Sequence, residues 1–410
     1  MWNGYGSNLK IWLPFIPAYT VLALFETSLT LYVVESLKQD LIYVGILMMV
    51  GEAVFIPASA FWGYLCDYLK RYKVFLTIPF LFMGMITFSI NYIKDPYILL
   101  LIYGVFSLFL SMHRPAVSLF IAESSSFDEW LQVMSLYMLI RSITSSIGFL
   151  LGTLCSNIPY SLIFIGIGIL YLLSFILSSL MIYEPQLKIE RKITSIDRRL
   201  NVINYSLSLL RFADDPNYSS YVLKMVSRLQ GTGFIRFLIG VLLFTLATSL
   251  IFTPMPIILK QAFAERSTIF LILFANSLAS SLTYLFIGKL IGYGMRSVRM
   301  SCLSRSIITL ILIPFLLNPS PSSLIVVSIL LASMGVMWAL FDLSTNYLSL
   351  ELSPYGGVGV YFSLSKLGSV IGAFLGGFLT ASYGLATMLL TGCVIFLTAL
   401  IAFLSIREHP

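Results

Sequence analysis

Charged residues are scarce in this chain. Asp, Glu, Lys and Arg make up only 10% of its 410 residues, whereas 58% are hydrophobic. A soluble domain carries roughly 25% charged residues, because its surface must face water. The chain has too few charged side chains to cover a water-soluble globule of its size. We therefore expect a lipid bilayer to surround most of it.

Cysteine, histidine and common enzyme motifs are also nearly missing. The four cysteines stand singly and the two histidines are far apart, so the sequence predicts neither a disulfide framework nor a metal site. It contains no phosphate-binding loop, no His-Glu-x-x-His zinc motif and no Gly-x-Ser-x-Gly nucleophile elbow. We expect no enzyme activity and no cofactor.

Long hydrophobic runs are the dominant feature of the sequence. Each is close to the length of about 20 residues that a helix needs to cross a bilayer, and too long for the alternating strands of a membrane β-barrel. The runs lie at about 11–33, 42–62, 74–93, 97–120, 131–155, 160–182, 233–257, 268–291, 300–317, 322–347, 357–381 and 384–405. They predict an all-α integral membrane protein with twelve transmembrane helices.

A polar stretch separates the sixth run from the seventh. It divides the chain into a predicted N-terminal bundle at 1–183, a central cytoplasmic linker at 184–231 and a C-terminal bundle at 232–410. Basic residues concentrate in this stretch and in the loops on the same side of the membrane, which is typical of cytoplasmic loops. The net charge of +7 therefore indicates topology rather than a nucleic-acid partner. We expect a multi-pass protein of the cytoplasmic membrane with both termini in the cytoplasm.

Several short patterns recur in the two predicted bundles. The loops after the second and the eighth run both begin with glycine and end with arginine, and the fifth and eleventh runs both contain a Gly-x-x-x-Gly pair, which lets membrane helices approach closely. The recurring glycines are Gly63 and Gly288 in the loops, and Gly148, Gly152, Gly372 and Gly376 in the runs. Together these echoes indicate two duplicated halves of six helices each.

In these patterns the chain resembles the major facilitator superfamily of transporters. The family's loop after the second helix has a glycine, an acidic residue and then basic residues, which Gly63, Asp67, Arg71 and Lys73 match. Its fourth helix ends at an acidic residue, which Glu123 matches. The resemblance implies two pseudo-symmetric six-helix bundles that act as a monomer and alternate in access around a site near the membrane midplane.

The loop motif predicts a gate at the cytoplasmic side. Asp67 can face the positive N-terminal end of a helix in the other bundle, and Arg71 can pair with Glu123 at the end of the fourth helix. Such contacts form only when that side of the transporter is closed. The alternative is a plain loop whose basic residues fix the topology, and Tyr68 stands where a basic residue often follows the acid in the family.

Six ionisable residues of the predicted spans are candidate functional residues. A charged side chain at the bilayer centre costs at least about 2.5 kcal/mol, so each must face a cavity or a partner. They are Glu26, Glu52, Arg114, Arg141, Asp342 and Lys366. All fall on helices that line or flank the central cavity in the family that the chain resembles. We interpret them as candidate residues for substrate binding or coupling.

We expect these charges to form pairs within each bundle. Glu26 or Glu52 is predicted to pair with Arg141, and Asp342 with Lys366. A carboxylate whose partner changes with conformation can couple transport to protons, whereas the alternative is a set of static ion pairs that hold helices together. Arg305, by contrast, is predicted near the end of the ninth helix, with its charged group reaching the membrane interface.

Together these features predict a secondary active transporter that moves a small organic solute by alternating access and is coupled to protons. Two alternatives keep the same fold: a multidrug/proton efflux antiporter, and a receptor or scaffold that does not transport. The fifth run lacks the Gly-Pro pair of the family's antiporters, which counts against drug efflux. An intramembrane enzyme would need an acidic cluster or a metal-binding loop, and the short outer loops are poor in both. The expected partners are the solute, a coupling proton and the lipid bilayer.

Overall fold

The structure is a computed structural model that describes residues 12–69, 71–124, 127–183, 232–290, 294–352 and 357–406. Over these residues the chain is helical and contains no β-strand. Twelve of its segments are long and apolar enough to cross a membrane. The predicted all-α membrane fold with twelve spans is therefore confirmed.

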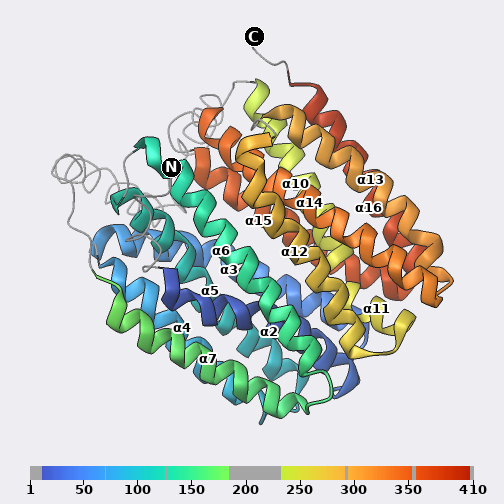
Figure 1. Ribbon diagram of the computed structural model, residues 1–410, viewed down its shortest axis with the longest axis horizontal. Coiled ribbons are helices and arrows are strands. Elements are labelled where there is room, and N and C mark those ends of the chain that lie inside the picture. The colour runs from blue at the N-terminus through green and yellow to red at the C-terminus, as the bar shows by residue number, and fades with distance from the viewer. Residues whose placement is uncertain are drawn as a thin grey trace, which may run out of the picture.

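The first six spans follow a short 3₁₀ turn, η1 (Leu13–Phe15), and form one bundle. They are α2 (Ile16–Glu35), α3 (Leu41–Leu69), α4 (Tyr72–Ile90), α5 (Pro96–Ser124), α6 (Phe127–Leu154) and α7 (Tyr160–Met181). Proline stands in the first turn of α2 and opens α5, where its missing N–H costs no hydrogen bond and its fixed φ suits a helix. Figure 1 shows this bundle in blue to green at one side of the molecule.

The last six spans form the second bundle, coloured yellow to red in Figure 1. They are α10 (Thr232–Phe252) with its continuation α11 (Met255–Phe263), then α12 (Arg266–Leu290), α13 (Met295–Leu317), α14 (Pro321–Glu351), α15 (Gly357–Tyr383) and α16 (Leu385–Leu404). The seventh span is divided into two helices at Pro254, because a proline inside a helix removes a backbone hydrogen bond and clashes with the preceding turn.

The two bundles have the same pattern of helix contacts. In the first, α2 packs against α6 and α7, and α5 packs against α3 and α4. In the second, α10 packs against α15 and α16, and α14 packs against α12 and α13. Each contact has its counterpart six spans later, so the bundles are pseudo-symmetric, as the duplicated sequence patterns predicted.

Recurring glycines explain one of these matched contacts. A Cβ atom on Gly148 of α6 would lie 2.0 Å from the carbonyl oxygen of Thr20 on α2, and one on Gly372 of α15 would lie 2.2 Å from the carbonyl oxygen of Leu246 on α10. Only glycine permits this approach of backbone to backbone, which is a common way for helices to pack within a membrane.

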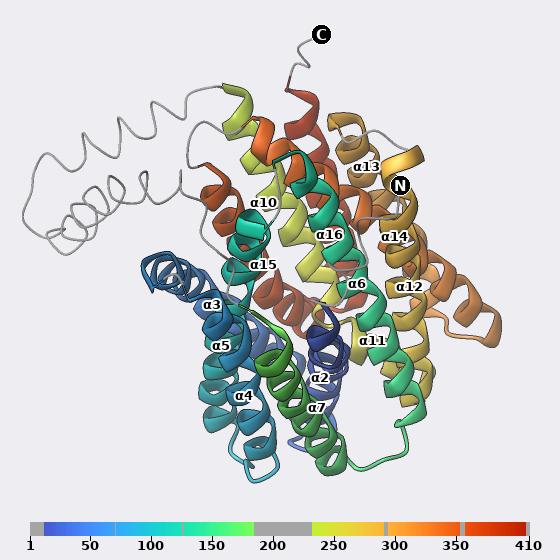
Figure 2. The same ribbon diagram turned by 60° about the vertical axis from the view of Figure 1, so that its left-hand side comes forward.

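The bundles meet each other along two helix pairs. Helix α3 packs against α15, and α6 packs against α12 (Figures 1 and 2). A Cβ atom on Gly45 of α3 would lie 2.9 Å from the carbonyl oxygen of Ala373, and one on Gly377 of α15 would lie 2.4 Å from the carbonyl oxygen of Leu41. These close contacts lie at the end of the molecule that holds Glu35, which we call the Glu35 end; the opposite end is called the Leu69 end.

Hydroxyl groups line the second of these pairs. The Ser281 hydroxyl of α12 donates to the Ser142 hydroxyl of α6 at 2.8 Å, and the Ser146 hydroxyl of α6 donates to the Ser277 hydroxyl of α12 at 3.0 Å. Small polar side chains let the two helices lie close together without interlocking large groups. The interface between the bundles is therefore narrow and polar at this point.

Candidate substrate cavity

A partly open cavity of about 660 Å³ lies between the two bundles. Its lining comes from α3, α5 and α6 of the first bundle and from α10, α12, α14 and α15 of the second. On α3, α5, α14 and α15 the lining residues stand between the middle of the helix and its Leu69 end, whereas on α6 they reach past the middle to Phe149. Four of the predicted residues are in direct contact with this space: Arg114, Arg141, Asp342 and Lys366.

Glu52 and Lys366 form an ion pair that joins the bundles across the cavity. The Nζ atom of Lys366 lies 2.6 Å from a carboxylate oxygen of Glu52, and it lies 4.7 Å from the ring centroid of Phe55. Asp342 was predicted as the partner of Lys366, and this prediction was wrong. The prediction assumed pairs within one bundle, whereas the direct packing of α3 on α15 places the pair between bundles.

Asp342 is instead held by neutral hydrogen-bond donors of its own bundle. The Tyr284 hydroxyl of α12 donates to one of its oxygens at 2.9 Å, and the side-chain amide of Asn346 donates to the other at 3.1 Å. Asn346 is one helical turn beyond Asp342, so the two face the same side of α14. The carboxylate is thereby oriented toward the cavity, and among the described residues no ion pair fixes it there.

The second predicted pair, of Glu26 or Glu52 with Arg141, is not formed among the described residues. Within the described part of the chain, no acidic side chain lies within ion-pair distance of the Arg141 guanidinium. The Arg114 guanidinium, from the neighbouring α5, lies 5.5 Å from the ring centroid of Phe55. Asp342 interacts electrostatically with both arginines. The first bundle thus presents two guanidinium groups to the cavity, and the second bundle presents a carboxylate.

Glu26 lies near the middle of α2, outside the described lining of the cavity. Its side chain is accessible, and its strongest electrostatic neighbours are Glu52 and Lys366. The structure therefore brings two of the predicted carboxylates close to a single lysine.

The gate motif is only partly described. Gly63 lies on α3, next to Pro115 of α5, where a Cβ atom would make an ordinary contact of 3.5 Å, and Arg71 precedes the first turn of α4. The side chains of Asp67 and Glu123 lie outside the described residues. The predicted contacts of the gate therefore remain predictions.

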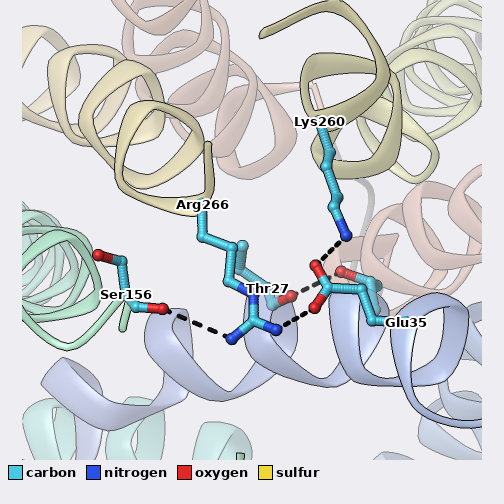
Figure 3. A network of polar contacts seen from close by, with 6 residues as sticks. Thr27, Glu35, Ser156, Lys260 and Arg266 are labelled. Atoms are coloured by element: carbon cyan, nitrogen blue, oxygen red, sulfur yellow. Dashed lines mark hydrogen bonds and ion pairs between the residues drawn. The ribbon is translucent and has the colours of Figure 1, made fainter. Parts of the chain in front are cut away.

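A second cluster of charges closes the Glu35 end, and the sequence did not single it out. The Glu35 carboxylate, at the end of α2, accepts hydrogen bonds from Lys260 of α11 and Arg266 of α12 (Figure 3). The Arg266 guanidinium also donates to the carbonyl oxygen of Ser156 at 3.5 Å and lies 4.3 Å from the ring centroid of Tyr160. These contacts connect the first bundle to the second, and we call them the Glu35 latch.

Arg305 differs most from its prediction. Helix α13 begins at Met295, which places Arg305 near its middle rather than near its end, and only 1% of the residue is exposed. Its guanidinium donates to the Thr248 hydroxyl at 2.8 Å and to the Met334 carbonyl oxygen at 2.9 Å. It also lies within 6 Å of four ring centroids, those of Phe244, Phe252, Trp338 and Phe396. The predicted position at the membrane interface was wrong.

Two signals in the sequence could have found the missed residues. Glu35 was the first acidic residue after a predicted span, and Lys260 and Arg266 were two of the few basic residues predicted on the opposite side from the linker. Charges in such loops can meet when the helices that carry them pack together. For Arg305, the neighbouring spans contain the aromatic residues that surround it, but their positions in the sequence do not show that the rings come together around the arginine.

Twelve membrane helices in two pseudo-symmetric bundles, with a charged cavity between them, define a membrane transporter rather than an enzyme. The family model of the Major Facilitator Superfamily matches residues 11–364. The chain belongs to this superfamily.

Solved structures share the fold over the whole chain. The crystal structure of the nucleoside transporter NupG is similar with a TM-score of 0.68 and 13% sequence identity, over 99% of this chain and 100% of that chain. A mutant of NupG is similar with a TM-score of 0.64 and 14% identity, over 98% of this chain and 100% of that chain. At these identities the likeness shows the fold alone. No curated protein matches the sequence.

Proposed function

We propose that the chain is a secondary active transporter that moves a small organic solute across the cytoplasmic membrane by alternating access. One observation carries this proposal: the charged cavity lies between the bundles, while direct contacts join the bundles at the Glu35 end. A solute in the cavity is thus separated from the Glu35 end by packed helices. Rocking of one bundle against the other exchanges which end is closed.

The Glu35 latch supports this mechanism because its three charged residues come from both bundles. Opening the Glu35 end must separate Glu35 from Lys260 and Arg266, so the latch stabilises only the conformation that is closed at this end. In the proposed topology the Leu69 end is cytoplasmic, as are both termini, and the gate motif of Gly63, Asp67, Arg71, Lys73 and Glu123 closes that end in the opposite conformation.

Glu26, Glu52 and Lys366 are the proposed coupling residues. A proton that binds either carboxylate changes the charge that faces Lys366, and the pair of Glu52 with Lys366 spans the two bundles. Protonation and bundle contact are thereby linked through one ammonium group. The proposed transporter is a monomer with bundles at 1–183 and 232–410 and a cytoplasmic linker at 184–231.

The test is transport into proteoliposomes that contain the purified full-length chain. Solute movement is measured with and without a pH gradient, for organic acids, amino acids, sugars, nucleosides and cationic drugs. Nucleosides are included because one similar structure is that of a nucleoside transporter. Glu26→Gln and Glu52→Gln are compared with Glu265→Gln, an exposed glutamate outside the cavity.

Gradient-driven accumulation that is lost in Glu26→Gln or Glu52→Gln, but kept in Glu265→Gln, supports the coupled mechanism. Transport of equal extent with and without the gradient removes proton coupling and leaves a uniporter. Extrusion of a cationic drug in exchange for protons favours the efflux alternative. A solute that binds tightly but never crosses the membrane contradicts transport and favours a receptor.

A further inference from the structure

The described lining of the cavity carries more positive than negative side chains. Arg114, Arg141 and Lys366 are its basic residues and Asp342 is its acidic residue, while Glu52 and Glu26 lie beside the lining, near Lys366. Glu52 is already paired with Lys366 at 2.6 Å. Among the described residues, the lining side chains of Arg141 and Asp342 form no ion pair and can bind a solute.

The hydrogen bonds of Asp342 leave Arg141 available. Asp342 is satisfied by the Tyr284 hydroxyl and the Asn346 amide, which are neutral. Arg141 stands on the other bundle, and no acidic side chain of the described residues lies within ion-pair distance of it. A guanidinium needs an anionic or polar partner when it is removed from water. An anionic group of the solute can supply that partner when water leaves the cavity.

A fourth cation, Arg305, lies behind the cavity wall. Arg305 is buried among aromatic rings and donates only to a hydroxyl and a carbonyl oxygen among the described residues. Its Cζ atom lies 5.5 Å from the ring centroid of Trp338, which lines the cavity. Since arginine keeps its charge and a buried charge is weakly screened, Arg305 adds to the positive potential on the second bundle's side.

The rest of the lining suits the body of an organic molecule. Phe55, Phe149 and Trp338 provide apolar faces, while Ser142 and Asn276 are among the residues that provide hydroxyl and amide groups. A volume of about 660 Å³ is in the usual range for a small-molecule site. The lining therefore combines an anion-binding guanidinium with aromatic surfaces.

We infer that the transported solute is an organic anion whose carboxylate or phosphate group binds Arg141 while its apolar body packs against Trp338 and Phe149. A planar guanidinium can donate two parallel hydrogen bonds to either group, and these are stronger than bonds between neutral groups. The inference rests on the proposed transport function and names the chemical class of its solute.

The test is equilibrium binding to the purified full-length chain with matched probes. Aromatic and aliphatic carboxylates are each compared with their primary amides, and uridine 5′-monophosphate is compared with uridine. We expect at least one anion to bind about tenfold tighter than its neutral partner, with an affinity that falls as salt rises. The carboxylate and phosphate pairs distinguish which anionic group is preferred.

The variant Arg141→Gln should bring the anion and its neutral partner to within about twofold of each other, with little change for the neutral probe. Arg141→Lys should keep part of the preference, which separates a charge effect from a failure to fold. Arg236→Gln serves as the control, since Arg236 is exposed and donates to the carbonyl oxygen of Ser405.

Two results overturn the inference: neutral or cationic probes that bind as tightly as every anion, or an anion preference that persists in Arg141→Gln. These outcomes leave the transport proposal intact. The transport proposal fails separately if the preferred anion binds but does not enter proteoliposomes.

Discussion

Glu52 of α3 and Lys366 of α15 are 314 positions apart in the sequence, and their charged atoms lie 2.6 Å apart in the structure. The pair belongs to neither bundle alone. It lies where the bundles meet beside the cavity, so the proposed movement of the bundles relative to each other would make or break it. Its energetic role can be measured directly.

The double-mutant cycle of Glu52→Gln and Lys366→Met should show coupling between the two sites. Each single change leaves one charge without its partner, and the double change removes both. We expect a coupling free energy of about 0.5–3 kcal/mol, measured by thermal unfolding in detergent. Additive effects of the two changes would show that the pair contributes nothing to the folded protein.

Weakening the Glu35 latch should shift the protein toward the conformation open at the Glu35 end. Glu35→Gln removes the charge that Lys260 and Arg266 share. Because the group is only partly shielded from water, we expect a loss of about 1–2 kcal/mol from the closed conformation. Spin labels at Lys94 and Asn318, which are exposed at this end of different bundles, should report a longer distance by electron paramagnetic resonance.

The control for the latch is Glu265→Gln. Glu265 is exposed in the loop before α12, and its carboxylate accepts a hydrogen bond from the neighbouring Ser267 hydroxyl at 3.4 Å. The same loss of charge there should leave the label distance unchanged. A lengthening in both variants would mean that net charge, rather than the latch, sets the conformation.

Arg305→Lys should destabilise the second bundle. An ammonium group cannot reproduce both the bonds to Thr248 and Met334 and the planar contact with the surrounding rings. We expect a loss of roughly 2 kcal/mol or more in thermal unfolding. Arg236→Lys, at an exposed arginine, should have almost no effect, and equal stability of the two variants would contradict a structural role for the buried guanidinium.

Gly148→Ala should separate α6 from α2. The added methyl group would lie 2.0 Å from the Thr20 carbonyl oxygen, so one helix must move, at an expected cost of about 1–3 kcal/mol. Gly166 of α7 is the matched control, since a Cβ atom there meets nothing within 4 Å. Gly166→Ala should be neutral or slightly stabilising, because alanine is the better helix former. Thermal unfolding of both variants under the same conditions decides between these outcomes.

The sequence predicted the fold well because membrane helices are encoded locally. A run of about 20 apolar residues identifies a span without knowledge of its neighbours, and Gly148 and Gly372 marked matched helix contacts. The sequence identified the candidate site residues as a group, the charged residues within spans, because such a charge must face a cavity or a partner. Four of the six line the described cavity, and Glu52 lies beside it in contact with Lys366.

The partners of these charges could not be predicted in the same way. Pairing depends on which faces of two helices are in contact and on which turns lie opposite each other. Helices α3 and α15 pack together although most of the chain separates them in the sequence. The error on Arg305 has a simpler origin. The predicted ninth span began at residue 300, whereas α13 begins at Met295, and this difference moved the arginine from the end of the helix to its middle.

The close contact of Gly45 with Gly377 has a geometric consequence for the mechanism. It brings two backbones together near one end of two long helices, and it contains no side chain that must be pulled out of a pocket when the helices tilt. The part of α3 from Gly45 to Leu69 is about 36 Å long at the rise of an α-helix. A tilt of roughly 10° about the glycine contact would therefore move the far end of α3 by about 6 Å. In the proposed alternating-access mechanism, the glycine pair would act as the fulcrum of a lever, and a small angular change at one face of the membrane would become a solute-sized displacement at the other.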